Sequence, residues 1–464
     1  MNFTISDLLR STHKRAIGFD KLTPSTRFKN VSTDSRTIKK GDLFIALRGE
    51  TFDGHAYLDA VKRSGAIAAV IDAKFYTANK NKLPKGFAIL VVSDTAFTYG
   101  ELANICRKKF SIPILLVAGS NGKTTTKDVL SHVLGTSFNL LKTEANYNNH
   151  VGLPRMLFQL NPSHELAVLE IGTNHPGEIA RLTTIAEPTH GIITNIGREH
   201  LEFFKNVQGV AKEELTLFDY LLKHEGIGFV NLDDKYLRPF AKKFSVFGSS
   251  YSTNAPADVI CRSKGLTKTG SHLLEIEAGG KAVTIRTNLL AEYAPSLVAA
   301  VVSVAFGFGM KMSAIKKSLE AYKPHSKRME IVKMASGVVV INDCYNANPE
   351  SFEAAMQTLK NIPAKGKKYV VAGDMFELGD RSKAEHTALG KVMAGYNFNG
   401  YYFSGEAMKN AFKKLKSTKP KASAIHLASK TDIAMILGAV LQKGDVILLK
   451  GSRGMRMEQL LDLL

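Results

Sequence analysis

Short hydrophobic runs alternate with segments of helical spacing along the chain, and this alternation is typical of an α/β fold. In the first part of the chain, the runs at 41–49 and 65–72 are bounded by Gly and Asp and predict strands. Residues 56–65 and 98–110 place apolar side chains at helical intervals. We therefore expect a small mixed α/β domain over residues 1–110.

A second unit begins at 113–135 with PILLVAGSNGKTTTKDVLSHVLG, which predicts a strand, a glycine turn and a helix. The run at 272–287 predicts a strand pair. Buried-type strands separated by helical stretches predict a parallel sheet covered by helices. We expect this central domain to span residues 111–323, with further strands at 166–172, 191–197 and 226–234 and closing helices at 295–310 and 313–323.

Strands and helices alternate again over residues 324–464, which predicts a second doubly wound, Rossmann-like sheet. The strands are expected at 338–343, 367–374, 400–405 and 445–452, and the helices at 351–362, 384–396, 407–417 and 432–442. The fold class predicted for the whole chain is therefore α/β, with three domains.

Composition narrows the class of protein. The chain has 464 residues, of which 44% are hydrophobic and 22% charged, enough to bury several cores. It contains no run of eighteen apolar residues and does not begin like a secretion signal. Its cysteines, Cys106, Cys261 and Cys344, are odd in number and far apart, so they predict neither a disulfide framework nor a metal site. We expect a cytoplasmic protein without a membrane segment.

The net charge of +20 is the unusual feature of the composition. Such a charge is compatible with nucleic-acid binding or with the attraction of acidic substrates such as nucleotides. The lysines are scattered along amphipathic stretches, as in KNAFKKLKSTKPK, with no interleaved aromatic residues. This pattern favours a solvated basic surface that gathers small anions, and we expect no nucleic acid as partner.

The turn in the second unit has the composition of a phosphate-binding loop. Glycines let backbone N–H groups approach phosphate oxygens, and the following helix start adds partial positive charge. Val117 stands where the standard loop has its first glycine, so an ordinary strand–helix turn is the alternative. The candidate phosphate-binding residues are Gly119, Ser120, Asn121, Gly122, Lys123, Thr124 and Thr125.

Two further residues are candidates for a metal site. Glu170 ends a predicted strand, and the ends of parallel strands face the ligand crevice of such sheets. A carboxylate in a buried strand is costly unless it is paired or bound to metal. His200 follows another strand end, in the loop GREHLE. The alternatives are a glutamate satisfied at its strand end and a histidine at the surface.

These motifs resemble the Mur ligase family. The middle of the chain is similar to the family's central ATPase domain, and the first part to its uridine-nucleotide-binding domain. The last part is similar to the branch that adds a dipeptide, and the DNPR signature of the branch that adds the third residue is absent. The similar segments are STDSR, GDLFIALRGETFDGHAYLDAVKRSGAIAAV, GSNGKTTT, NYNNHVGLP, LEIGTNHPGEI, ITNIGREHLE, NDCYNANPESF, VVAGDMFELG and KGSRGMRME.

The resemblance implies an ATP-dependent amide ligase that adds D-alanyl-D-alanine to UDP-N-acetylmuramoyl-tripeptide during peptidoglycan precursor synthesis. In the family, the tripeptide carboxylate attacks the γ-phosphate of ATP, and the dipeptide amine then displaces phosphate. Anionic reactants repel each other unless cations lie between them, so ATP and Mg²⁺ are the implied cofactors. We expect a monomer, although nothing in the sequence itself fixes the oligomeric state.

Roles for individual residues follow from the resemblance, in addition to those of the phosphate loop. Thr124, Glu170 and His200 match Mg²⁺ ligands. Arg328 matches an arginine that reaches from the last domain toward the γ-phosphate, which implies closure of the domains. Residues matching substrate contacts are Asn346 and Asn348 for the dipeptide and Ser35 and Arg36, with Asp34, for the nucleotide-sugar.

The chain departs from the family pattern at Glu214. Relatives have a lysine there that CO₂ converts to a carbamate, which helps to hold a second metal. Glu214 already carries a carboxylate and is a candidate to replace that group, which would place it with Lys123, His200 and Arg328 among the catalytic residues. Two alternatives remain open: Lys212 takes this role in a shifted register, or Glu214 faces solvent.

The adenine-binding stretch departs as well. Where the family has asparagines, this chain reads AEYAPSLVAA, with Tyr293 and Ser296 near the expected positions. We expect Asn288, Tyr293 and Ser296 to contact the nucleotide, with adenine stacked on the tyrosine.

Two other functions remain open, namely a divergent Mur-type ligase with another amino acceptor and a basic nucleotide-binding protein without catalysis.

Overall fold

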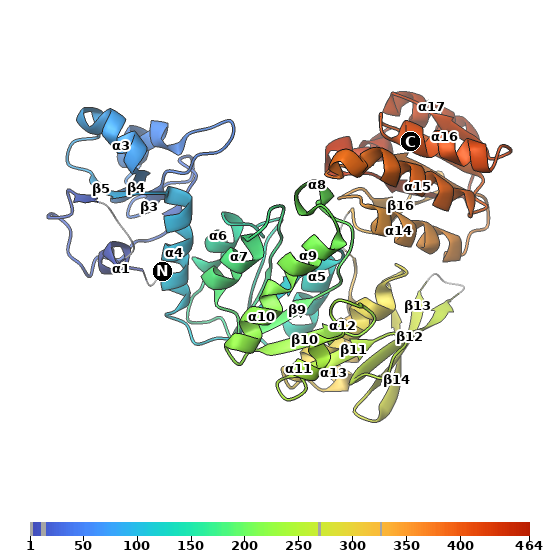
Figure 1. Ribbon diagram of the computed structural model, residues 1–464, viewed down its shortest axis with the longest axis horizontal. Coiled ribbons are helices and arrows are strands. Elements are labelled where there is room, and N and C mark those ends of the chain that lie inside the picture. Colours follow the sequence, from blue (N-terminus) through green and yellow to red (C-terminus); the bar gives the residue numbers. More distant parts are fainter. Residues whose placement is uncertain (1–2, 11–14, 268–270, 325–326) are drawn as a thin grey trace.

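The computed structural model describes residues 3–10, 15–267, 271–324 and 327–464. Three domains, each built around its own sheet, follow one another along the chain (Figure 1). The α/β fold class with three domains is confirmed. Among the described residues no helix is long and apolar enough to cross a membrane.

The first domain has a five-stranded sheet in the order β1-β5-β4-β3-β2, parallel except for β1. Every residue of β4 and β5 is buried, and the strand predicted at 65–72 corresponds to β4. The strands are β1 (Arg15–Ile17), β2 (Val31–Ser32), β3 (Leu43–Ile45), β4 (Ala68–Asp72) and β5 (Ala88–Val92). The helices are α1 (Ile5–Leu9), η1 (Gly54–Tyr57), α2 (Leu58–Arg63), α3 (Ala73–Asn79), η2 (Lys80–Lys82) and α4 (Thr95–Arg107).

The central domain has a nine-stranded sheet in the order β14-β13-β12-β11-β10-β9-β6-β8-β7. The strands from β7 to β12 in this order are parallel, and β13 and β14 form the predicted antiparallel pair. The strands are β6 (Ile114–Ala118), β7 (Leu140–Lys142), β8 (Leu166–Glu170), β9 (His190–Ile193), β10 (Ile227–Asn231), β11 (Gly248–Ser252), β12 (Val259–Leu266), β13 (His272–Ala278) and β14 (Lys281–Thr287). The helices are α5 (Lys123–Leu134), α6 (Gly152–Leu157), α7 (Glu178–Ala186), α8 (Leu201–Phe204), α9 (Val207–Glu214), α10 (Thr216–Lys223), α11 (Phe240–Lys243), α12 (Ala294–Gly307) and α13 (Met312–Ala321).

The last domain has a six-stranded sheet in the order β15-β16-β20-β17-β18-β19, with only β15 antiparallel to its neighbour. The strands are β15 (Glu330–Lys333), β16 (Val339–Asp343), β17 (Lys368–Gly373), β18 (Gly400–Ser404), β19 (Ala424–His426) and β20 (Val446–Lys450). The helices are α14 (Pro349–Asn361), η3 (Gly379–Arg381), α15 (Ser382–Ala394), α16 (Met408–Thr418), α17 (Lys430–Val440), η4 (Arg453–Met455) and η5 (Met457–Asp462).

Helix α4 joins the first domain to the central one. One hydrophobic cluster continues across both, from Phe3 and Phe28 to Met156. The Arg107 guanidinium, buried at the end of α4, donates from Nε to the Ala186 carbonyl at 2.9 Å, at the end of α7. Such a shared core holds the two domains together.

The centre of the nine-stranded sheet positions the candidate site. Strand β6 lies between β8 and β9, and all three run parallel. Their carboxyl ends therefore meet at one edge, where Gly119, Glu170 and Thr194 follow or end the strands. This is where the chain order of the strands changes direction, the usual position of a ligand crevice.

Candidate nucleotide-binding and catalytic site

A cavity of about 850 Å³ lies between the central and the last domain. Its lining brings together many of the predicted site residues: Ser120, Asn121, Gly122, Lys123, Thr124, Thr125, Glu170, His200, Tyr293, Ser296, Arg328, Asn346 and Asn348. Its volume lies within the range typical of sites for small ligands and cofactors. Residues separated by more than two hundred positions in the chain thus face one space.

The glycine turn between β6 and α5 has the geometry that its sequence predicts. Gly119 and Gly122 adopt φ values of +112° and +82°, in a region that L side chains rarely occupy. A Cβ at Gly119 would come within 2.4 Å of the Thr194 hydroxyl oxygen, so only glycine fits there. The Ser120 amide donates to the Asn195 carbonyl at 2.8 Å, which ties the loop to the end of β9.

Lys123 begins α5 and turns its ammonium back over the loop. Nζ donates to the Gly119 carbonyl, and it lies 3.3 Å from Oε2 of Glu199. Burial alone would lower the pKa of this ammonium, but the carboxylates of Glu199, Glu214 and Glu170 outweigh burial and raise the pKa above its usual value. Lys123 is therefore a fixed positive charge at the phosphate loop.

Glu199 is a member of this site that the sequence analysis missed. It is 7% exposed and pairs with Lys123 from the loop that also carries His200. The only feature of the sequence that could have identified Glu199 is its position next to His200, a candidate metal ligand.

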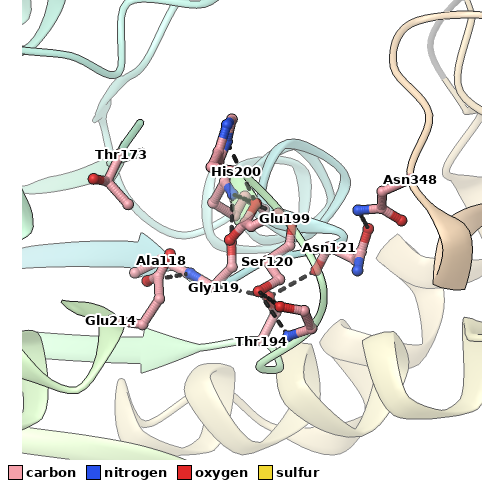
Figure 2. A network of polar contacts seen from close by, with 12 residues as sticks. Ala118, Gly119, Ser120, Asn121, Thr173, Thr194, Glu199, His200, Glu214 and Asn348 are labelled. Atoms are coloured by element: carbon pink, nitrogen blue, oxygen red, sulfur yellow. Dashed lines mark hydrogen bonds and ion pairs between the residues drawn. The ribbon is translucent and has the colours of Figure 1, made fainter. Parts of the chain in front are cut away.

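Glu214 is fully buried and faces the phosphate loop (Figure 2). Its Oε2 accepts a hydrogen bond of 2.8 Å from the Gly119 amide. Burial raises its pKa to about 8, although the charge of Lys123 acts in the opposite direction. Lys212 is exposed. The alternative in which Glu214 faces solvent is therefore wrong, and the shifted register with Lys212 has no support from this geometry.

Neighbouring Glu213 has a structural contact of its own. Its two carboxylate oxygens accept hydrogen bonds of 2.8 Å from the Gly177 and Ile179 amides, at the start of α7. A carboxylate in this position satisfies backbone donors that the helix leaves unpaired.

The donor groups in the cavity fit a magnesium ion held between protein and phosphates. Oε2 of Glu170 and Oε1 of both Glu199 and Glu214 are buried, and they have no hydrogen-bond partner among the described residues. Within the same residues, no group of three His, Cys, Asp or Glu side chains is close enough to hold a metal alone. Mg²⁺ usually takes one or two carboxylates and completes its shell with phosphates and water, so this arrangement suits it.

The last domain contributes side chains to the phosphate loop. Arg328 donates from Nη2 to the Thr124 hydroxyl at 2.9 Å, and its guanidinium lies 3.7 Å from the centroid of the Tyr345 ring. Asn348 caps α14 and donates from Nδ2 to Oδ1 of Asn121 at 2.8 Å (Figure 2). The predicted approach of Arg328 to the loop is thus present in this conformation.

Asn346 lies on the wall of the cavity beside a buried lysine. Its carbonyl accepts a hydrogen bond of 3.1 Å from Nζ of Lys450, which also forms an ion pair of 2.5 Å with Asp343. Lys450 is 1% exposed, so this pair fixes the end of β16 and the loop that follows.

Other predicted contacts are distributed differently. Tyr293 and Ser296 line the cavity, whereas Asn288 is not among the described lining residues and donates to the Tyr322 carbonyl at 3.1 Å. The adenine contact expected for Asn288 therefore lacks support.

Ser35 and Arg36 lie in the first domain, away from the cavity lining. There Arg36 donates to both carboxylate oxygens of Asp34 and lowers the pKa of that carboxyl to about 2.

The described motifs and geometry agree with comparisons to known proteins. Family models match as Mur ligase family, catalytic domain (27–107), Mur ligase middle domain (117–305) and Mur ligase, glutamate ligase domain (327–453). The chain is 31% identical over 94% of its length to the UDP-N-acetylmuramoyl-tripeptide–D-alanyl-D-alanine ligase of Bacillus subtilis (strain 168), covering 93% of that protein. It is 32% identical to the ligase of the same name from Escherichia coli (strain K12), over 92% of each chain.

Solved structures match over nearly the full length. A crystal structure of MurF from Acinetobacter baumannii superposes with a TM-score of 0.88 at 28% identity, covering 99% of this chain and 98% of that one. MurF ligase from Thermotoga maritima in complex with ADP gives a TM-score of 0.81 at 28% identity, covering 94% of this chain and 97% of that one.

The raised pKa of Glu214 predicts a stability effect that depends on pH. Between about pH 4.5 and 8 the native state keeps a proton that the unfolded chain releases, so this group makes the free energy of unfolding fall as the pH rises. Glu214→Gln removes the titration and keeps an oxygen for the Gly119 amide. We expect the ligand-free variant to melt several degrees above the wild type at pH 8 and close to it at pH 4.5.

Differential scanning calorimetry at the two pH values measures this difference. Glu213→Gln is the contrasting variant: it replaces one of two oxygens that accept backbone hydrogen bonds, so it should lower the melting temperature at pH 8 and not raise it. A Glu214→Gln protein with the melting temperature of the wild type at pH 8 would contradict the raised pKa.

Proposed function

Because the chain belongs to the Mur ligase family, we propose that it joins D-alanyl-D-alanine to UDP-N-acetylmuramoyl-tripeptide with cleavage of ATP to ADP and inorganic phosphate, in peptidoglycan synthesis. The observation that carries this function is the cavity in which the phosphate loop of the central domain meets the Asn346–Asn348 loop of the last domain. Similarity to ligases of this specificity extends over more than nine tenths of the chain, so it includes all three domains.

The reaction requires two negatively charged groups to approach each other. A carboxylate oxygen of the tripeptide attacks the γ-phosphorus of ATP and ADP leaves, which forms an acyl phosphate. The dipeptide amine then attacks the acyl carbon, loses a proton, and inorganic phosphate leaves. Catalysis of such steps consists mainly of positioning and charge neutralisation. In this chain Lys123 of the central domain and Arg328 of the last domain supply positive charge to the cavity.

We propose Mg²⁺ as a further cation of the site, held by Thr124, Glu170 and His200. It would neutralise phosphate charge as the acyl phosphate forms. The buried oxygen of Glu170 that lacks a partner among the described residues supports this assignment. Thr124 keeps its hydroxyl beside the phosphate loop, where Arg328 now contacts it.

The substrates enter from different domains in this proposal. Ser35 and Arg36 bind the nucleotide-sugar end of the acceptor in the first domain (residues 1–110), and the central domain (111–323) binds ATP through its phosphate loop, Thr125, Tyr293 and Ser296. Asn346 and Asn348 bind the dipeptide in the last domain (324–464). We further propose that the protein acts as a cytoplasmic monomer and does not use nucleic acid.

The decisive test is mass spectrometry of the product formed from UDP-N-acetylmuramoyl-tripeptide, D-alanyl-D-alanine, ATP and Mg²⁺. We expect a product heavier by the dipeptide minus water, with one ADP released for each bond. Lys123→Ala should lower turnover by about 100-fold or more, as the loss of one charge-stabilising donor does in other active sites. Exposed Lys212→Ala, the matched control, should keep normal turnover.

Two outcomes would contradict the proposal. ATP hydrolysis with no ligated product would favour another amino acceptor, and near-normal turnover of Lys123→Ala would refute the assigned phosphate loop.

We also propose that Glu214 supplies directly the carboxylate that relatives obtain from a lysine carbamate. Its burial, its contact with the Gly119 amide and its oxygen Oε1, which has no partner within the described part of the chain, support this role. Turnover of the wild type should then be the same in degassed and in bicarbonate-containing buffer. Glu214→Ala should be nearly inactive in both buffers, and Glu214→Lys should regain activity only with bicarbonate.

Turnover of the three proteins in the two buffers measures the effect. Loss of wild-type activity on degassing, or normal activity of Glu214→Ala, would show that another group holds this position.

A further inference from the structure

A carboxylate of the last domain contacts the candidate metal ligand of the central domain. Oε2 of Glu377, in the loop between β17 and η3, lies 2.8 Å from Nδ1 of His200. The contact has the distance of an ion pair, although Nδ1 does not meet the angles of a hydrogen bond with any described partner. The His200 side chain is 13% exposed and that of Glu377 is 48% exposed, so the contact lies at the mouth of the cavity.

Both residues have unfavourable backbone conformations. His200 has φ +47° and Glu377 has φ +62°, in the left-handed region that residues with a side chain seldom occupy. Gly379 packs against Glu202 close to this contact, with φ +51°. Strained conformations persist where the surrounding structure requires them, and they concentrate at functional sites. His200 and Glu377 both have this conformation and meet across the domain boundary, which directs attention to their contact.

The Nε2 edge of the His200 ring is directed toward the phosphate loop. Nε2 of His200 lies 3.8 Å from Oε2 of Glu199, the carboxylate that pairs with Lys123. His200 therefore lies between two carboxylates, one in its own domain and one in the other. Figure 2 shows His200 and Glu199 side by side above the phosphate loop.

We propose that Glu377 is a positioning residue that orients His200 for the cation when the last domain closes on the central domain. In the cation-bound state Nδ1–H would donate to the Glu377 carboxylate, which lies 2.8 Å away, and the lone pair of Nε2 would be left for the cation on the phosphate side. Histidines that bind metals generally donate their other ring N–H to such a group, which fixes the ring and raises its basicity. This inference rests on the proposed function, because it needs the cation that the ligase reaction uses.

A second contact between the same two domains allows the positioning role of Glu377 to be distinguished from a general contribution to domain closure. Nε of Arg198 lies 2.5 Å from Oε1 of Glu350, and its Nη1 lies 3.0 Å from Oε2 of Glu385. This cluster joins the same two domains from the residue two positions before His200. Arg198→Ala therefore removes a neighbouring cross-domain contact and keeps the Glu377 carboxylate itself.

The experiment compares Glu377→Ala, Glu377→Gln and Arg198→Ala in the full chain. Binding of Mn²⁺ in the presence of ADP, followed by electron paramagnetic resonance, reports the cation site without turnover. We expect Glu377→Ala to weaken Mn²⁺ binding by about 10-fold or more, the range typical for loss of such an outer partner. Glu377→Gln should recover part of this loss, since its amide oxygen accepts the same N–H.

Steady-state kinetics provide the second measurement. Glu377→Ala should need about 10-fold more Mg²⁺ for half-maximal turnover, with little change in the KM for the dipeptide. Arg198→Ala should alter the KM values while Mn²⁺ affinity stays near that of the wild type. Melting temperatures of all variants establish that they are folded.

Two results would overturn the inference: Mn²⁺ affinity of Glu377→Ala equal to that of the wild type, or an equal loss in Arg198→Ala, which would reduce Glu377 to a closure contact. Failure of the proposed function is distinguishable, because it appears as absence of ligated product from the wild type.

Discussion

A buried ammonium held among buried carboxylates is the constraint on which the site depends. Lys123 has to remain charged inside a cavity, and nearby carboxylates, Glu199 first among them, keep it so by raising its pKa. Three carboxyl groups around one ammonium leave an excess of acceptor oxygens, some of them without a partner among the residues described. Such an arrangement is costly in a ligand-free protein and suits one that binds further cations together with phosphate.

The two domains around the cavity contribute different parts of the site. The central domain supplies the loop, the ammonium and the carboxylates from adjacent strand ends. The last domain adds single side chains that each reach a different segment of it: Arg328 to Thr124, Asn348 to Asn121, and Glu377 to His200. Separation of the domains would remove all three contacts at once, so the complete site exists only in a closed form.

Local features of the sequence predicted much of this arrangement, and long-range features could not be predicted. The turn at Gly119 was recognisable because its glycines, the lysine and the helix start are adjacent. Glu214 was placed by its position in the helix, but its burial depends on the fold around it. Glu199 and Glu377 were missed because their roles come from partners distant in sequence. Asn288 was predicted to contact the nucleotide from its position alone, yet its amide is used by the Tyr322 carbonyl.

The strands, too, were for the most part predicted where their own sequence indicates them and missed where their pairing partners determine them. Most long apolar strands and the strand pair at 272–287 were predicted, whereas β5, β7, β11 and β12 are among the strands that were not. Strand β7 has three residues and β11 is rich in serine, so neither has a hydrophobic run. Both are strands because of the neighbours with which they pair.

The continuous hydrophobic core beneath α4 has a consequence for substrate selection. Since Arg107 and the cluster around Phe3 and Met156 hold the first domain on the central one, the span from Arg36 to the phosphate loop is set when the protein folds. In the proposed substrate arrangement, a nucleotide-linked peptide held near Arg36 would present its terminal carboxylate to the phosphate only if its length matched this span. Under that arrangement, the fixed distance between the first two domains would select peptide length, whatever the position of the last domain.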